Sequence, residues 1–174
     1  MLAEIRKGKI LPPVVKHITQ EKVNLYASAS GDFNPIHVNE SFAAQTPLGG
    51  TIAHGMLISA YVSELMTLAF GQSWLSGGKL SIRFKAPARP GDIVTVTGKI
   101  DSIEERNSIS YANCGLECHN QKDETIVIGE ATVKLAGNIP FCHPEPERSE
   151  VGGSKRGRDS SLTLRMTEAI FEES

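Results

Sequence analysis

Two reactive side chains, Asp32 and His37, lie five residues apart in the chain. Both side chains can hold or release a proton near neutral pH, so the pair is suited to general acid–base catalysis. A second histidine, His54, precedes Gly55 at the start of a long apolar run. A backbone N–H at a helix N-terminus points outward with positive dipole character, so the Gly55 amide could stabilise an oxyanion. Adding water to a double bond beside a thioester requires an acid–base pair and a donor to the developing oxyanion, and so does the reverse elimination.

Spacing alone does not decide this interpretation. The chain has 20 acidic residues and 5 histidines, so an aspartate near a histidine is an ordinary coincidence. Asp32 could instead hydrogen-bond its own turn, because Asn34-Pro35 is a common turn-forming pair. His37 and His54 with one acid could in principle bind zinc, but their spacing matches no recognisable ligand set. The sequence therefore predicts no metal site.

Two elements are predicted ahead of the long apolar run. The β-branched residues after a Pro-Pro pair predict a short edge strand over 10–18. Thr19 is the expected N-cap of a helix over 20–30, in which apolar residues recur at helical spacing. Asn39 begins a further short helical turn, which the following proline and glycines end.

The stretch from Ile52 to Phe70 is predicted to be one helix, about 28 Å long at 1.5 Å per residue. Thr51 is its expected N-cap, and Gly71 is its expected C-terminal stop. Because apolar residues lie on every side of this helix, we expect it to be buried in protein. Its polar interruptions argue against a membrane span.

After the long helix, the apolar residues alternate instead of recurring at helical spacing. This pattern predicts four strands, at 79–87, 92–103, 108–120 and 124–136. Consecutive strands with short links predict an antiparallel meander, and the long helix must then cover its apolar face. The predicted fold class is therefore α+β.

Length and composition favour one globular domain over residues 1–140. The segment 141–174 is rich in charged residues, serine, glycine and proline, and is predicted to be a disordered tail. The net charge of −2 gives no general attraction to nucleic acid or membrane. Three cysteines, an odd number, and a first segment without the apolar core of a signal peptide predict a cytoplasmic location. Cys114 and Cys118 are expected to fill space on one face of a strand.

The longer sequence pattern resembles a known family. The matching segments are 29–37 (ASGDFNPIH), 42–43 (FA), 52–56 (IAHGM), 83–87 (RFKAP) and 90–92 (PGD). Together they resemble the hydratase 2 motif of the MaoC-like dehydratases, a family that includes the (R)-specific enoyl-CoA hydratases. The likeness extends over about residues 10–136.

The resemblance implies a hot-dog fold, in which an antiparallel sheet wraps around one long helix. It also implies a hydro-lyase acting on an acyl thioester carried by coenzyme A or acyl carrier protein, without a cofactor. Asp32 and His37 match the family's catalytic pair, and the Gly55 amide matches its donor to the thioester carbonyl. In the same way, the residues placed near the substrate are Asn34, His54, Met56 and Ser63.

Two other functions remain open at this point, a hot-dog thioesterase and a non-catalytic acyl-thioester binding module. A run of basic residues on one face of a strand and its following loop is either solvated or meets the phosphates or acidic surface of the carrier. These residues are Lys79, Arg83, Lys85 and Arg89. A single hot-dog sheet leaves an edge strand uncovered, so we expect a homodimer.

Overall fold

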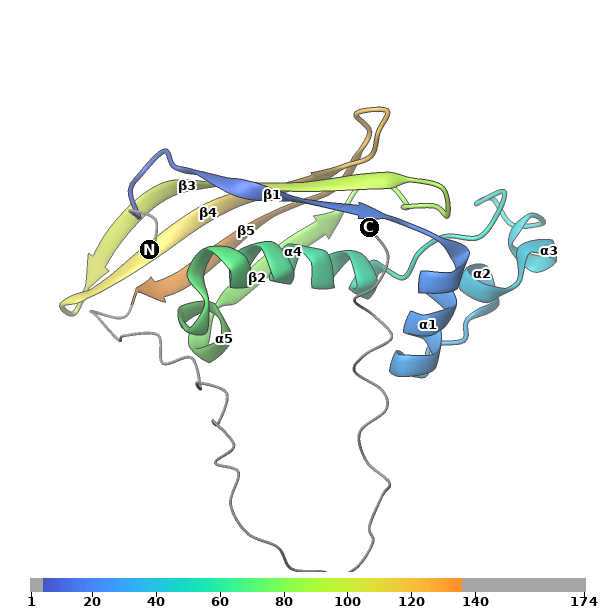
Figure 1. Cartoon of the computed structure of the whole chain (residues 1–174), viewed down its shortest axis with the longest axis horizontal. Coiled ribbons are helices and arrows are strands. Elements are labelled where there is room, and N and C mark those ends of the chain that lie inside the picture. Colours follow the sequence, from blue (N-terminus) through green and yellow to red (C-terminus); the bar gives the residue numbers. More distant parts are fainter. Residues whose placement is uncertain (1–4, 136–174) are drawn as a thin grey trace, which may run out of the picture. The chain divides into compact units, whose positions relative to one another are not determined.

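The computed structural model describes residues 5–135, so the prediction for segment 141–174 lies outside the described residues. The chain forms an α+β hot-dog fold, a five-stranded antiparallel sheet curved around one long helix (Figure 1). The strands are β1 (Ile10–His17), β2 (Lys79–Phe84), β3 (Ile93–Arg106), β4 (Ile109–His119) and β5 (Thr125–Leu135). The helices are α1 (Gln20–Ser30), α2 (Pro35–Val38), α3 (Glu40–Ala43), α4 (Gly55–Phe70) and α5 (Gln72–Gly77). Among residues 5–135, no helix is both long enough and apolar enough to cross a membrane.

The order of the strands corrects the predicted meander. It is β1-β3-β4-β5-β2, so β3, β4 and β5 form a meander, whereas β2 pairs with β5 at the far edge. The link 85–92 must therefore cross one end of the sheet. Its Lys85 amide donates to the Ile126 carbonyl, and its Gly91 amide donates to the Ile18 carbonyl. Periodicity identifies a strand but does not say which neighbour that strand pairs with.

Helix α4 begins at Gly55, three residues after the predicted start, and Thr51 is not its N-cap. The reason is that the preceding backbone groups make other hydrogen bonds. The Ala53 amide donates to the Ala88 carbonyl in the crossing link, and the Ile52 amide donates to a carbonyl of α2. Because these contacts hold residues 51–54 away from helical geometry, Gly55 becomes the first helical residue.

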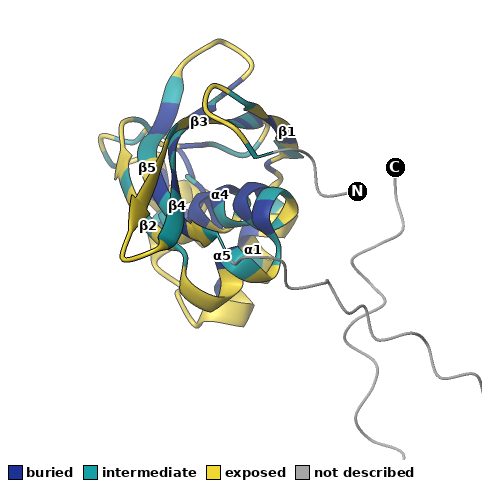
Figure 2. Cartoon of the chain, turned by 90° about the vertical axis from the view of Figure 1, so that its left-hand side faces the viewer, coloured by how far each residue is buried: buried dark blue, intermediate teal, exposed yellow. Residues whose placement is uncertain are grey.

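The core lies between the sheet and α4, where the buried residues gather (Figure 2). Helix α4 contributes Ile58, Val62 and Leu65, each at most 2% exposed. Burying a side chain of this size stabilises the fold by about 1.5–3 kcal/mol. The predicted burial of α4 is confirmed on the side that faces the sheet. It does not extend around the whole helix, because Met56 and Leu68 are 64% and 70% exposed.

The two cysteines of β4 occupy the inner face of the sheet, as predicted. Cys114 and Cys118 are both buried and unpaired, and they face the core from alternate positions of the strand. Burial raises the pKa of each thiol to about 11. The reactive thiolate is therefore disfavoured, and both residues act as small apolar side chains.

Gly129 lies where β2 and β5 pair, opposite Ile82. A Cβ at this position would lie 2.6 Å from the Ser81 carbonyl oxygen, which belongs to the backbone and cannot rotate away. We expect Gly129→Ala to lower the free energy of unfolding by about 1–3 kcal/mol in urea denaturation, because the strands must shift. The matched control is Gly77→Ala, where an added Cβ meets nothing within 4 Å. Equal stability of the two variants would contradict this prediction.

Candidate active site

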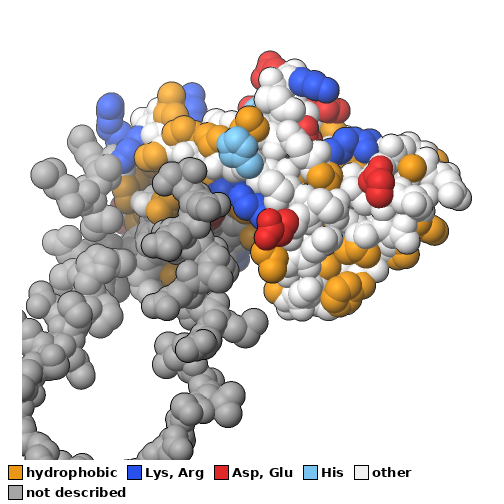
Figure 3. All heavy atoms as spheres, turned by 45° about the vertical axis from the view of Figure 1, so that its right-hand side comes forward, with side chains coloured by type: hydrophobic (Ala, Val, Ile, Leu, Met, Phe, Trp, Pro, Cys, Tyr) orange, Lys and Arg blue, Asp and Glu red, His pale blue; other side chains and the backbone are white. Residues whose placement is uncertain are grey.

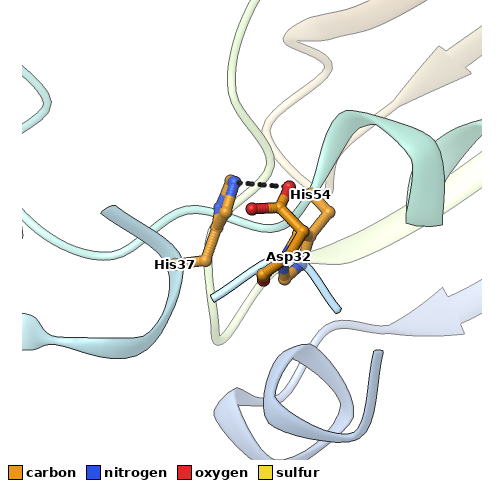
Figure 4. A group of neighbouring side chains, drawn as sticks. All are labelled: Asp32, His37 and His54. Carbon is orange, nitrogen blue, oxygen red and sulfur yellow. Dashed lines mark hydrogen bonds and ion pairs between the residues drawn. The ribbon is translucent and has the colours of Figure 1, made fainter. Parts of the chain in front are cut away.

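The loop that carries Asp32 is shaped by local hydrogen bonds. Helix α1 ends at Gly31, which adopts a left-handed conformation with φ of +77°. The Asp32 amide donates to Ser30 Oγ at 3.3 Å, and the Asn34 amide donates to Asp32 Oδ1 at 3.2 Å. Oδ1 of the carboxylate is therefore engaged within its own turn, and Oδ2 faces His37 (Figure 4).

His37 is held by α2, whose N-cap is Asn34. The Asn34 Oδ1 accepts from the Ile36 amide at 3.2 Å, which fixes the start of this short helix. Nδ1 of His37 lies 2.8 Å from the Ile52 carbonyl oxygen. Because a carbonyl can only accept, Nδ1 carries the proton and Nε2 keeps a free lone pair. Nε2 lies 4.0 Å from Asp32 Oδ2.

The separation of the two acceptors suits one shared water molecule. A gap of 4.0 Å between Asp32 Oδ2 and His37 Nε2 is too long for a direct hydrogen bond. Two hydrogen bonds of about 2.8 Å would span it with an angle of about 90° at the water oxygen, which is roughly 20° narrower than tetrahedral. The Asp32 side chain is 54% exposed and that of His37 is 9% exposed. The pair therefore lies at the border between solvent and the interior.

His54 connects this loop to the start of α4. Its Nε2 lies 2.9 Å from the Asp32 main-chain carbonyl oxygen, so Nε2 carries the proton and donates it. Its ring stacks on that of His37, with 3.8 Å between centroids, and packs against Tyr26 at 4.9 Å. Its Nδ1 is buried and has no hydrogen-bond partner among the described residues. In this tautomer that position is a bare lone pair, not an unsatisfied N–H.

The same three residues are close enough to be considered as metal ligands. One atom from each of Asp32, His37 and His54 lies within 4.8 Å of the others. However, a histidine binds a metal in the plane of its ring, and these rings are stacked with 29° between their planes. Their lone pairs therefore run side by side and do not converge on one point, and this geometry does not fit a tetrahedral zinc site.

A cavity of about 310 Å³ lies beside His37 and Gly55. The Gly55 amide donates no hydrogen bond to residues 5–135, because it is the first residue of α4. A Cβ on Gly55 would lie 3.0 Å from the Phe84 ring, so any larger residue would have to displace that ring. The remaining lining residues are Ile52, Ala53, Ile58, Phe84, Lys85, Ala86, Pro87, Ala88 and Ile126. The wall is thus largely apolar, with contributions from the crossing link 85–92.

The lining of this cavity contains none of the four predicted substrate-binding residues, Asn34, His54, Met56 and Ser63. Met56 is 64% exposed and is not among the residues that line it. Ser63 lies about two turns further along α4. Its Oγ accepts a hydrogen bond of 2.9 Å from the Trp74 indole, which attaches α5 to α4. The structure therefore brings together Asp32, His37 and Gly55, with Asn34 and His54 holding the loop of the pair and Met56 and Ser63 lying elsewhere on α4.

The basic residues after the long helix do not all share one face, because only Lys79 and Arg83 belong to β2. Arg83 lies on the sheet face that is turned away from α4. Lys85 lines the cavity, while Arg89 donates to the Leu48 carbonyl at 2.6 Å. Alternation places Lys79 and Arg83 on one face of β2, whereas Lys85 and Arg89 follow the end of the strand and belong to the crossing link.

The sequence did not point to Gln20, which contacts the site loop from α1. Its Nε2 donates to the His37 main-chain carbonyl at 2.8 Å, and its Oε1 accepts from Thr51 Oγ1 at 2.8 Å. These partners are 17 and 31 residues away in the chain. No local pattern marks such a contact, because it depends on how the segments pack.

Comparisons with known proteins agree with this geometry. Residues 4–117 match the family model described as MaoC like domain. The 3-hydroxybutyryl-CoA dehydratase of Methylorubrum extorquens is 34% identical over 69% of this chain and 74% of its own length. The (R)-specific enoyl-CoA hydratase of Rhodospirillum rubrum is 32% identical over 76% of this chain and 89% of its own.

The fold agrees with a solved relative as well. The (R)-hydratase of Aeromonas caviae superposes with a TM-score of 0.65 and 30% identity, over 77% of this chain and 99% of that one. Sequence and structure thus give the same assignment over most of both chains. The protein belongs to the MaoC-like dehydratase family.

Proposed function

We propose that this protein is a hydro-lyase that interconverts trans-2-enoyl thioesters and (R)-3-hydroxyacyl thioesters. The observation that carries the proposal is the separation of 4.0 Å between Asp32 Oδ2 and His37 Nε2, next to a largely apolar cavity. The named activities of the relatives support the same class of reaction. The acyl group is carried by coenzyme A or by acyl carrier protein.

In hydration, Asp32 and His37 hold the two hydrogens of one water molecule. A lone pair of the water oxygen then faces C3 of the substrate. As the C3–O bond forms, one member of the pair takes a proton from the water, and the pair delivers a proton to C2. Water is thereby added across the double bond without any other reactant. Dehydration is the same sequence in reverse.

The thioester carbonyl accepts a hydrogen bond from the Gly55 amide. Negative charge develops on that oxygen as the double bond electrons move toward C2, and the free N–H at the start of α4 stabilises it. Because α4 is buried against the sheet, the amide needs no rearrangement during the reaction. The acyl chain occupies the apolar part of the cavity, between Ile58 and Phe84.

Replacing either member of the pair tests the proposal. Asp32→Asn keeps an oxygen that accepts from the Asn34 amide but removes the proton acceptor, and His37→Gln removes the free imidazole lone pair. We expect each change to lower kcat for crotonyl-CoA hydration by about 10²- to 10⁴-fold. The measurement is the loss of enoyl absorbance together with release of free thiol.

The matched controls are Asp123→Asn and His17→Gln, which alter exposed side chains of the same types. Both should retain the activity of the unaltered protein. Release of thiol would indicate a thioesterase and contradict the proposal. Absence of both signals in the unaltered protein would indicate a binding module without catalysis.

We also propose that two copies pair as a homodimer through the outer edge of β2. The other edge strand, β1, contains Pro12 and Pro13, and its register with β3 is irregular there. These features disfavour pairing of a further strand along the outer edge of β1. β2 has no proline, and in residues 5–135 its outer edge pairs with no strand. Phe84, at the end of β2, is 48% exposed and lines the cavity, so a second copy would cover apolar surface there.

This proposal predicts a mass of twice 18.8 kDa by sedimentation or light scattering. Phe84→Asp places a charge at the proposed contact and should shift the protein toward a monomer. Leu75→Asp is the matched control, because Leu75 is 65% exposed on α5 and does not belong to β2. A monomer for the unaltered protein, or equal masses of both variants, would contradict the pairing through β2.

We also propose that the protein is located in the cytoplasm. Cys114 and Cys118 are unpaired and buried, which supports folding in a reducing compartment. We therefore favour the cytoplasm. Exposed apolar side chains also gather at the α1–α3 end, where hydrophobic side chains are visible on the surface (Figure 3); they are Leu25, Phe33, Val38 and Phe42. That end carries the loop of the active site.

A further inference from the structure

Gln20, the first residue of α1, makes a hydrogen bond with every polar group of its side chain. Nε2 donates to the main-chain carbonyl of His37 at 2.8 Å and to Asn24 Oδ1 at 2.9 Å. Oε1 accepts from Thr51 Oγ1 at 2.8 Å. The orientation of the amide is unambiguous, because a backbone carbonyl can only accept and so must face the nitrogen. The side chain is half-buried between α1 and the site loop.

Thr51 is held from a second side. Its amide donates to the Glu40 carboxylate at 3.0 Å, and this backbone hydrogen bond lowers the pKa of Glu40, so the acceptor stays ionised near neutral pH. The Thr51 side chain is 7% exposed. Gln20 and Glu40 therefore fix Thr51 between α1 and α3, directly before Ile52.

Ile52 is the residue whose carbonyl orients the His37 ring. His37 Nδ1 donates to that carbonyl at 2.8 Å, and the Ile52 amide donates to the Ile36 carbonyl at 3.1 Å. These contacts close a cycle. Gln20 donates to the His37 backbone, the His37 ring donates to Ile52, Ile52 is joined to Thr51 by the peptide bond, and the Thr51 hydroxyl donates back to Gln20. Every member of the cycle is tied to the next by a hydrogen bond or a peptide bond.

Within this cycle, Gln20 connects the backbone of His37 to Thr51, and Thr51 is followed by Ile52, whose carbonyl orients the His37 ring. Without Gln20, the carbonyl of His37 and the hydroxyl of Thr51 lose these partners. The Ile52 carbonyl could then shift relative to α2, and His37 Nε2 would move relative to Asp32. A displacement of about 1 Å in a reacting group can cost roughly 10²-fold in rate.

We propose that Gln20 is a positioning residue, which acts through Thr51 and the His37 backbone to fix the direction of His37 Nε2. This inference rests on the proposed hydro-lyase function. Gln20 is absent from the lining of the cavity, so its effect is on the geometry of the Asp32–His37 pair and not on binding of the substrate.

Gln20→Leu removes all three hydrogen bonds and keeps a side chain of similar size. We expect kcat for crotonyl-CoA hydration to fall by about 10- to 100-fold while KM changes by less than about 3-fold, since ground-state binding is preserved. Gln45→Leu is the matched control, because Gln45 is exposed and its side chain makes no hydrogen bond within residues 5–135. A Gln20→Leu protein with the kcat of Gln45→Leu would overturn the inference, as would a change in KM alone.

A second pair of variants tests the cycle from its other side and does not depend on the folding of Gln20→Leu. Thr51→Val removes the hydroxyl that reaches Gln20 and should lower kcat by about the same factor, whereas Thr51→Ser keeps a hydroxyl and should restore it. Combined with Gln20→Leu, Thr51→Val should add little, because both changes break one cycle. Equal kcat values for Thr51→Val and Thr51→Ser would contradict the role of the hydroxyl.

The design separates this inference from the proposed function. Lack of hydration by the unaltered protein contradicts the function and leaves nothing for Gln20 to position. Hydration by the unaltered protein, with normal kcat in both Gln20→Leu and Thr51→Val, contradicts the positioning role alone. Loss of hydration in Asp32→Asn together with a kcat-only effect in Gln20→Leu supports both.

Discussion

The hydrogen bond from His37 Nδ1 to the Ile52 carbonyl is the contact on which both halves of the site depend. It fixes the tautomer of the imidazole, and so leaves Nε2 facing Asp32. It also engages the Ile52 carbonyl and, together with the hydrogen bonds of the Ile52 and Ala53 amides, it holds the residues before α4 outside the helix. Gly55 thereby becomes the first helical residue, with its N–H free beside the cavity. This contact therefore determines where His37 Nε2 points, and it contributes to the position at which α4 begins.

Local signals made much of the fold predictable. Thr19 caps α1, Gly31 ends it in a left-handed conformation, and Asn39 caps α3, each through contacts within a few residues. Such contacts depend on sequence neighbours, so their residue types can be recognised directly. The position of β2 at the far edge was not predictable in this way, because pairing with β5 is a contact between segments more than 40 residues apart. The late start of α4 was missed for the same reason, since distant carbonyls hold the residues before it.

The site shows the same division between local and non-local information. The motif around Asp32 and His37 and the glycine at the start of the helix pointed to three groups that do lie together. Met56 and Ser63 are close to Gly55 in sequence, but a helix turns by about 100° per residue and sends such neighbours in different directions. Gln20 has no motif of its own and became visible only once α1 was packed against the loop. Sequence neighbours thus suggested the reacting groups, whereas packing identified the groups that hold them in place.

The crossing link 85–92 has a consequence for how such a protein can change over time. It supplies one wall of the cavity, while Asp32 and His37 belong to a different segment and are held by α1, α2 and residues 51–52. Substitutions in the link can reshape the space for the acyl chain without touching the hydrogen bonds of the pair. Under the proposed function, substitutions of the link's side chains therefore alter the acyl cavity, whereas the hydrogen bonds that hold the Asp32–His37 pair come from other segments of the chain.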